Sequence, residues 1–410
     1  MDVTEEAAAP HDHPGTDRRW LSVGSSAATD PRAAAEAAVT AALTGADPKL
    51  LLVFCAARHD PRAVLAGVRS VAAGVPLIGG SASAVLGPDG PGRDEVVVVA
   101  LGGPGFSVVT AAAGGADTRQ REAGATAAVA AARVEDRPHR ALVLLTDGLS
   151  GGQEEILAGV YSVVGASVPL VGGSCSPDVG GLRGPAPARL RTFQFHGAEV
   201  LTNAVVAAAI ASDGPLGVGL RHGWRKVGEP MIVTKSSGGD VFTLDDRPAL
   251  TAYLQRLDAP TEAYTDPAAF EAFAQCRPLG IRRRSGCEVR GVSSPALVRE
   301  GWLHSSGEVP EGSLIWPMVG DEESVLAAAG DACADAVAAL GGQPPLGLVA
   351  FDCESRARML GPDGVRREFG RMTGQTGGAP VAGLYTWGEI GRPRGINGFH
   401  NQTLVVLAVG

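Results

Sequence analysis

The fold is decided by a stretch that occurs twice, as VPLIGGSAS at residues 75–83 and as VPLVGGSCS at residues 168–176. A motif that recurs at a long interval is the signature of a repeated structural unit. Its apolar first half has the composition of a buried strand, and the Gly-Gly-Ser that follows predicts a tight corner. The chain is therefore predicted to contain a duplicated unit.

The residues around both copies follow one order of predicted elements. An Ala-rich helix comes first, then an apolar strand, a second helix, the motif itself and a closing strand. The predicted ranges are 31–43, 50–55, 61–73 and 95–101 around the first copy, and 118–134, 141–145, 153–164 and 202–210 around the second. The unit reads α-β-α-β-β. Clustered Gly and Pro at 87–92 and 178–187 predict hairpin tips.

A third, more diverged copy is predicted near the C-terminus. Its elements are a helix at 324–340, a strand at 346–351, a helix at 365–372, a Pro-led corner at 379–385 and a closing strand at 403–409. The corner replaces Gly-Gly-Ser with GLYTWGE at 383–389. Residues 214–317 are less regular, with strands expected at 231–234 and 313–317 and a helix at 248–257, and we expect a degenerate fourth unit there.

These patterns predict an α/β protein with two domains of repeated α-β-α-β-β units, in which helices cover mixed sheets. A chain of 410 residues also exceeds the roughly 250–300 residues at which a single core stops growing. We expect a disordered leader at 1–19, a first domain with two repeats at 20–225 and a second domain at 226–410.

Composition excludes some classes of function. A net charge of −9 and a pI near 5.4 disfavour a nucleic-acid binder, which needs a basic face. The sequence has neither a signal-peptide pattern nor an apolar run of the ~20 residues that a spanning helix needs, so no membrane contact is expected. Six scattered cysteines without a C-x-x-C pair predict free thiols in a reducing cytoplasm.

The C-terminal residues resemble a known family. GLYTWGEIG at 383–391, followed by FHNQT at 399–403, resembles the closing motif of FIST C domains, and FDCESR at 351–356 stands where that family tends to carry a strand ending in Cys-x-x-Arg. The Gly-Gly-Ser corners resemble those of FIST N domains. The similarity covers about residues 20–410.

This resemblance implies a sensory protein that binds a small ligand such as an amino acid. Some bacterial members of the family bind haem and sense nitric oxide, which implies an alternative function here. Such modules are usually joined to a signalling output domain, but none is visible in the sequence. We therefore expect the signal to pass to a separate signalling protein.

The Gly-rich corners are the first candidate ligand contacts. Glycine allows close backbone approach, and Ser81 and Ser174 add hydroxyl groups, so each corner could hold a carboxylate or a phosphate. The alternative is a tight strand bend or bulge. Neither corner precedes the helix that a phosphate-binding loop requires.

The third corner has a richer set of side chains. Tyr385, Thr386, Trp387 and Glu389 combine an aromatic wall, a hydroxyl and a carboxylate, which is the composition of an amino-acid pocket. Glu389 could bind an ammonium group and Arg356 a carboxylate in bidentate fashion, and we add Asn401 to the predicted ligand contacts. The alternative is a buried, purely structural ion pair between Arg356 and Glu389.

One thiol and three histidines are further candidates for site residues. Arg356 follows Cys353 by one helical turn and could lower the pKa of its thiol, with His400 as a base, although an inert buried thiol is the simpler interpretation. A haem would need a histidine facing an apolar pocket, for which His59, His222 and His400 are available. His400 could instead hydrogen-bond the backbone beside the third corner. No metal-ligand spacing is present.

An enzyme is not expected. The sequence shows no nucleophile elbow, Walker A loop or dinucleotide-binding fingerprint, and Asp147 at the end of a strand is weak evidence by itself. No pattern names a cofactor. The predicted function is ligand sensing, with a haem-based sensor or a scaffold without a ligand as alternatives.

Overall fold

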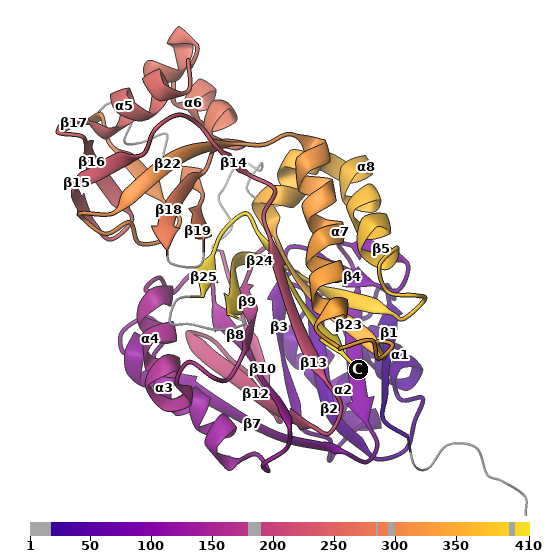
Figure 1. Cartoon of the computed structure of the whole chain (residues 1–410). Helices are drawn as coiled ribbons and strands as arrows, with labels where there is room; N and C mark the ends of the chain where they lie inside the picture. Colours follow the sequence, from indigo (N-terminus) through magenta and orange to yellow (C-terminus); the bar gives the residue numbers. More distant parts are fainter. Residues whose placement is uncertain (1–17, 179–189, 284–285, 294–299, 393–397) are drawn as a thin grey trace, which may run out of the picture.

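The computed structural model describes residues 18–178, 190–283, 286–293, 300–392 and 398–410, and it combines helices with mixed and antiparallel sheets (Figure 1). The predicted α/β class is confirmed. The predicted leader lies outside the described residues up to residue 17, as does most of the predicted hairpin tip at 178–187. The other tip is the turn between β4 (Val85–Gly87) and β5 (Gly90–Gly92), which pair antiparallel.

One arrangement of strands and helices occurs three times, and we call the three copies together the body. The first copy contains β1 (Trp20–Ser26), α1 (Pro31–Ala42), β2 (Pro48–Ala56), α2 (Pro61–Val71), β3 (Leu77–Ala82) and β6 (Val96–Gly102). The second contains β7 (Phe106–Gly114), α3 (Gln120–Arg133), β8 (His139–Asp147), α4 (Gln153–Val164), β9 (Leu170–Cys175) and β12 (Ala204–Ser212). The third contains β13 (Leu216–Arg221), α7 (Glu322–Ala338), β23 (Gly347–Cys353), α8 (Glu354–Thr373), β24 (Val381–Arg392) and β26 (Leu404–Val409).

Strand order is the same in each copy. It runs β1-β6-β2-β3, then β7-β12-β8-β9, then β13-β26-β23-β24, and the last two strands of each series are parallel and joined by a helix. The expected α-β-α-β-β unit lacked the leading strand (β1, β7 or β13), which pairs antiparallel with the closing strand. These leading strands are only partly buried, so their sequences lack a continuous apolar run.

The residues between β13 and α7 form a separate antiparallel unit, which we call the central unit (Figure 1). Its strands are β14 (Arg225–Lys226), β15 (Met231–Ser237), β16 (Asp240–Leu244), β17 (Arg247–Pro248), β18 (Leu279–Arg283), β19 (Gly286–Arg290), β20 (Val292–Ser293), β21 (Leu303–Ser305) and β22 (Leu314–Val319). Its helices are α5 (Ala249–Arg256), a 3-10 turn at Thr261–Tyr264 and α6 (Pro267–Ala274).

The expected fourth repeat is wrong. Every described strand pair of the central unit is antiparallel, so this region lacks the parallel strand-helix-strand pair of the other units. Its apolar residues alternate along half-buried strands and form a core of their own. The strands and the helix expected at 231–234, 313–317 and 248–257 are present as β15, β22 and α5.

The three copies share one core. Their inner sheet faces meet there, and Phe54 of the first copy lies edge-on against Phe351 of the third, with ring centroids 6.3 Å apart. Helices α1 and α2, α3 and α4, and α7 and α8 cover the outer faces. β24 pairs with β9 and joins the third copy to the second in an eleven-stranded sheet. The pairing of β13 with β26 therefore crosses residue 225, where the sequence placed a domain limit.

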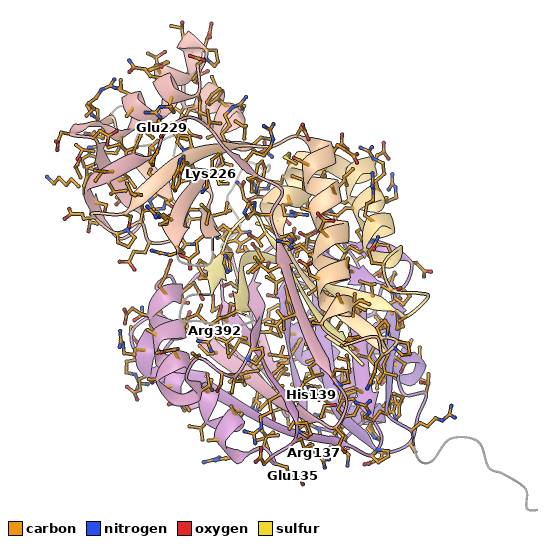
Figure 2. The ribbon with its side chains drawn as sticks, viewed as in Figure 1. Glu135, Arg137, His139, Lys226, Glu229 and Arg392 are labelled. Carbon is orange, nitrogen blue, oxygen red and sulfur yellow. The ribbon has the colours of Figure 1, made fainter. Side chains whose placement is uncertain are left out.

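Two chain segments connect the body to the central unit. The chain leaves the body after β13 and returns before α7, and β14 pairs with β22 along this path. Lys226 and Glu229 mark the outgoing segment, whereas Glu135, Arg137 and His139 lie at the far end of the body (Figure 2). No helix in the described part of the chain has both the length and the apolar character needed to cross a membrane.

Glycine at the three corners is required by close packing between parallel strands. A Cβ atom would lie 2.0 Å from the Val53 carbonyl oxygen if added to Gly79, 1.9 Å from that of Leu144 if added to Gly172, and 1.8 Å from that of Ala350 if added to Gly383. Only a hydrogen atom fits at these distances. The first glycine of each corner therefore has a structural function.

Replacing Gly79 by Ala is expected to lower the free energy of unfolding by about 2–3 kcal/mol, because the backbone of β3 must move away from β2. Gly74, which has no atom within 4 Å of an added Cβ, provides the control. Urea unfolding of both variants measures the difference, and an equal small effect at the two sites would contradict this account of the corners.

Candidate functional site

The carboxyl ends of the parallel strands of all three copies come together. The Ser176 amide donates to the Ser81 carbonyl oxygen at 3.2 Å, and the Ser176 hydroxyl donates to the Tyr385 carbonyl oxygen at 2.7 Å. The Ser83 hydroxyl donates to the carboxylate of Glu354. Residues far apart in sequence thus form one buried polar contact.

The two corner serines bond protein groups inside this contact. Ser81 and Ser174 are both fully buried. The Ser81 hydroxyl accepts from the Phe193 amide at 3.1 Å, and the Ser174 hydroxyl lies 2.8 Å from that of Thr146. Ligand contact by these two residues stays a prediction, while the geometry of the corner accounts for both hydroxyls.

Arg356 lies at the centre of a buried acidic cluster. Its Nε donates to Asp352 Oδ1 at 2.9 Å, its Nη2 bonds Glu368, and it also donates to the carbonyl oxygens of Val325 and His222. The alternative of a structural pair between Arg356 and Glu389 is wrong in its partner, because Asp352 in β23 and Glu368, beyond the kink of α8 at Gly361, pair with the guanidinium instead. The guanidinium is fully buried, so it does not face solvent or a cleft.

The buried position of Asp352 favours its protonated form. Burial and the neighbouring Glu368 raise the pKa of Asp352 well above its ordinary value. Asp352 Oδ2 and Glu368 Oε2 have no hydrogen-bond partner among the described residues. Burial alone would lower the pKa of Arg356, but Glu368 and Asp352 raise it, so the guanidinium stays charged. The Tyr385 hydroxyl beside them has no partner among the described residues.

Glu389 and Cys353 form a second buried pair. Burial raises the pKa of Glu389 to about 8, although bonds from Thr386, the Thr403 amide and the Cys353 thiol lower it in part. Glu389 Oε1 lies 2.7 Å from the Thr386 hydroxyl. Burial and the Glu389 charge raise the pKa of Cys353, so the expected lowering by Arg356 is wrong. The thiol remains protonated, which matches the simpler interpretation of an inert cysteine.

Each of the three candidate histidines has a ring nitrogen within hydrogen-bond distance of a backbone group. His400 Nε2 lies 3.0 Å from the Gly391 carbonyl oxygen, as the alternative role of His400 predicted, and burial lowers its pKa to about 4. His222 Nδ1 accepts from the Trp224 amide, and burial lowers its pKa to about 4 as well. His59 Nε2 lies 2.9 Å from the Asp94 carbonyl oxygen. Within the described residues, no three His, Cys, Asp or Glu side chains are grouped as metal ligands.

Asn401 lies where the body meets the central unit. The backbone amide of Asn401 donates to the Val289 carbonyl oxygen at 3.1 Å. The backbone carbonyl oxygen of the neighbouring Gln402 accepts from Trp224 Nε1 at 2.9 Å. The side-chain oxygens of Asn401 and Gln402 have no partner among the described residues. Trp387 of the third corner is half-buried, and its Cβ atom lies beside Gly148.

A cleft of about 810 Å³ opens beside this contact, at the carboxyl ends of β2 and β8. Its walls carry both signs of charge together with apolar groups and two hydroxyls. Among the lining residues are Arg58, His59, Asp60, Asp147, Leu149, Arg191, Thr192, Phe193 and Asn203. The volume falls within the roughly 300–1,000 Å³ typical of small-ligand sites.

Two groups in the cleft are arranged to meet a ligand. Thr192 is only 4 % exposed, and its hydroxyl has no partner among the described residues. Asp147 is likewise buried, and its two carboxylate oxygens accept from the amides of Leu149 and Asn203, each at 2.8 Å. Two other hollows, in the central unit and beside α2, have no unpartnered buried polar atom in their walls.

The sequence contained little sign of this cleft. Asp147 is noticeable at the end of an apolar strand, but Arg191 and Thr192 belong to no motif. They reach the cleft because β10 (Gln194–His196) pairs with β3 and with β11 (Glu199–Leu201). Such antiparallel pairing between distant segments leaves no periodic pattern.

Fold and site together define a repeat-built α/β protein with a ligand-sized cleft at its strand ends and an antiparallel unit attached by two chain segments. The chain belongs to the FIST family: the FIST N domain matches residues 49–247 and the FIST C domain residues 249–392. FIST domains are sensory signal-transduction domains. The resemblance seen in the corners and the closing motif is confirmed.

Two relatives come from Mycobacterium tuberculosis, strains CDC 1551 / Oshkosh and ATCC 25618 / H37Rv, and both are described as uncharacterized. Each is 29% identical over an alignment of 403 positions, and the match covers 93% of this chain and 97% of the relative. Among solved structures, a cyanuric acid hydrolase of A. caulinodans covers 96% of this chain and 99% of its own, with a TM-score of 0.32 and 10% identity. That degree of similarity transfers no activity.

Proposed function

We propose that the chain is a non-enzymatic sensor that binds an amino-acid-like metabolite in the cleft at the ends of β2 and β8. The observation that carries the proposal is the buried, unpartnered hydroxyl of Thr192 inside a cleft that also contains Asp147 and Arg191. A free hydroxyl in a buried wall favours a ligand that supplies the missing hydrogen bond.

The charges of the cleft fit a zwitterion. Arg191 is exposed and carries a guanidinium that matches a carboxylate, while the Asp147 carboxylate, which accepts from two amides, can accept from an ammonium group. Leu149 and Phe193 supply apolar surface for a side chain. This proposal places the ligand at the ends of β2 and β8 instead of on Arg356 and Glu389, whose contact with a ligand stays a prediction.

The output of the sensor is proposed to be a separate signalling protein, which agrees with the family's function in signal transduction. All six cysteines are unpaired, which supports a reducing compartment such as the cytoplasm. The buried, protonated thiol of Cys353 supports the absence of thiol catalysis at the corner.

The test is a thermal-shift screen of the full chain against the twenty proteinogenic L-amino acids, followed by calorimetry on any that raise the melting temperature. Native mass spectrometry of freshly purified protein reveals a ligand that co-purifies. Stabilisation by at least one amino acid supports the proposal. No shift with any of them, together with a clean apo mass, contradicts it and favours a scaffold.

Arg191→Gln is expected to weaken amino-acid binding about 10- to 100-fold, because a hydrogen bond to a charged group contributes about 1.5–3 kcal/mol. Thr192→Val is expected to weaken binding as well, yet to leave the free protein as stable as before or more so, since it removes an unsatisfied hydroxyl. Arg62→Gln and Thr118→Val, both on exposed residues outside the cleft, serve as matched controls. Equal affinity in all four variants would exclude the cleft as the binding site.

A further inference from the structure

One carboxylate of the body holds the central unit. Glu154, in the first turn of α4, accepts from the Glu308 amide at 2.8 Å and from Arg290 Nη2 at 3.3 Å. Both donors belong to the central unit. We call Glu154, Arg290 and the Glu308 amide the Glu154 latch.

Arg290 is built into this contact. Its side chain is 1 % exposed, and its Nη1 donates to the Phe399 carbonyl oxygen of the body at 2.8 Å. Its guanidinium lies 5.7 Å from the centroid of the Phe399 ring. Glu288, on the same strand, lies 3.4 Å from Nη2 and partly balances the charge. A buried guanidinium that bridges two parts of a protein holds them in one relative position, because separating them exposes unpaired groups.

The latch is continuous with the wall of the cleft. Residues 148–152 form the loop between β8 and α4, and Leu149 of this loop lines the cleft. Asp147 anchors both ends of the loop: its carboxylate accepts from the Leu149 amide, and its carbonyl oxygen accepts from Gln153 Nε2 at 2.8 Å. Glu154 is the next residue after Gln153. The cleft and the latch are therefore separated by one short loop.

Two glycines of this loop have left-handed backbone conformations. Gly151 and Gly152 have φ angles of 67° and 57°, in the region that glycine enters without strain. Gly152 is the N-cap residue of α4, so no side chain caps the first turn of this helix. By contrast, α2, which begins beside the same cleft, is capped by Asp60.

We infer that occupation of the cleft and closure of the Glu154 latch are coupled through residues 148–152, so that a bound ligand loosens the hold of the body on the central unit. The inference rests on the proposed function and adds its regulation. A ligand ammonium at Asp147 competes with the Leu149 amide for the carboxylate, which frees the loop and the first turn of α4. The central unit, attached to the body through β14 and the return segment before α7, is the part that responds (Figure 1).

The coupling is tested first without any ligand, because coupling between two sites is reciprocal. Glu154→Gln keeps an acceptor at the latch but removes the charge, and Glu155→Gln changes the neighbouring residue, which bonds Arg121 and not the central unit. Amide hydrogen exchange of the full chain is followed on peptides covering 147–153. Glu154→Gln is expected to accelerate exchange there about fivefold, the difference between a charged and a neutral hydrogen bond. Exchange equal to that of Glu155→Gln overturns the coupling.

The second arm uses the amino acid that gives the largest thermal shift. If the ligand favours the loosened latch, Glu154→Gln removes part of the cost of loosening it, and the affinity is expected to rise about fivefold relative to Glu155→Gln. An unchanged or lowered affinity overturns the inference. If no amino acid binds, the proposed function fails, and the ligand-free arm alone decides whether the loop couples the two places.

Discussion

Replacing Arg356 by Met is expected to lower the free energy of unfolding by about 3–5 kcal/mol at neutral pH, the usual cost of removing one partner from a buried ion pair. Asp352 and Glu368 are both fully buried and would lose the cation that offsets their charge. The loss should become smaller as the pH falls, because the raised pKa of Asp352 favours its protonated form, which removes part of the uncompensated charge.

Urea unfolding of the full chain at pH 7.0 and 5.0 measures this effect. Arg358→Met is the matched control, since Arg358 lies on the same helix, is half-exposed and approaches Glu354 only at 3.7 Å. Exposed pairs contribute about 0–1 kcal/mol. A loss at Arg356 no larger than that at Arg358 would show that the buried cluster does not depend on its guanidinium.

A second large effect is expected from Glu389. Its pKa is raised from 4.5 to about 8 in the folded protein. Below pH 4.5 the group is protonated in both the folded and the unfolded chain, so the folded state suffers no penalty. As the pH rises towards 8, the unfolded chain ionises first, and stability falls by up to about 5 kcal/mol at about 1.4 kcal/mol per unit of pKa shift.

Glu389→Gln should remove this part of the pH dependence. The amide faces one of the donors that the carboxylate accepted from, so the variant also loses some stability, but that loss does not depend on pH. The measurement is the free energy of unfolding at several pH values across the interval from 4.5 to about 8, with the exposed Glu323→Gln as control. Parallel curves for wild type and Glu389→Gln would show that Glu389 does not titrate in this range.

His400 acts in the opposite direction and at lower pH. Burial lowers its pKa from 6.5 to about 4, so stability is present above pH 6.5 and is lost as the pH falls towards 4. Wild type and Glu389→Gln both contain His400. The difference between their curves therefore isolates the contribution of Glu389.

The repeated corners show what local patterning can predict. Gly79, Gly172 and Gly383 each stand against a strand carbonyl oxygen, which no side chain allows, so the recurrence of glycine indicated the recurrence of the strand pair. The helices at 61–73 and 153–164 correspond to α2 and α4 within a few residues. Apolar strands and amphipathic helices arise from short-range periodicity, which a sequence displays directly.

The candidate site also combines features that the sequence indicated with features that it did not. Residues of the closing motif, among them Glu389 and His400, indicated that the third corner is chemically unusual, and the structure buries both of them with shifted pKa values. The partners of Arg356 were not predictable, because Asp352, Glu354, Glu368 and Glu389 all carry carboxyl groups. Which of them faces the guanidinium depends on how α8 packs on β23 and β24.

By itself the sequence determined the α/β class, the strand-helix-strand order of the three related units and the family, because these depend on periodicity, on glycine where backbones touch and on local motifs. Only the tertiary structure decided that three units share one core, that the central unit is antiparallel, and that Arg191 and Thr192 meet Asp147 in a cleft. The physical reason is that these contacts join segments far apart in the chain. Their partners are selected by shape, burial and charge in three dimensions, and such selection leaves no spacing rule in the sequence.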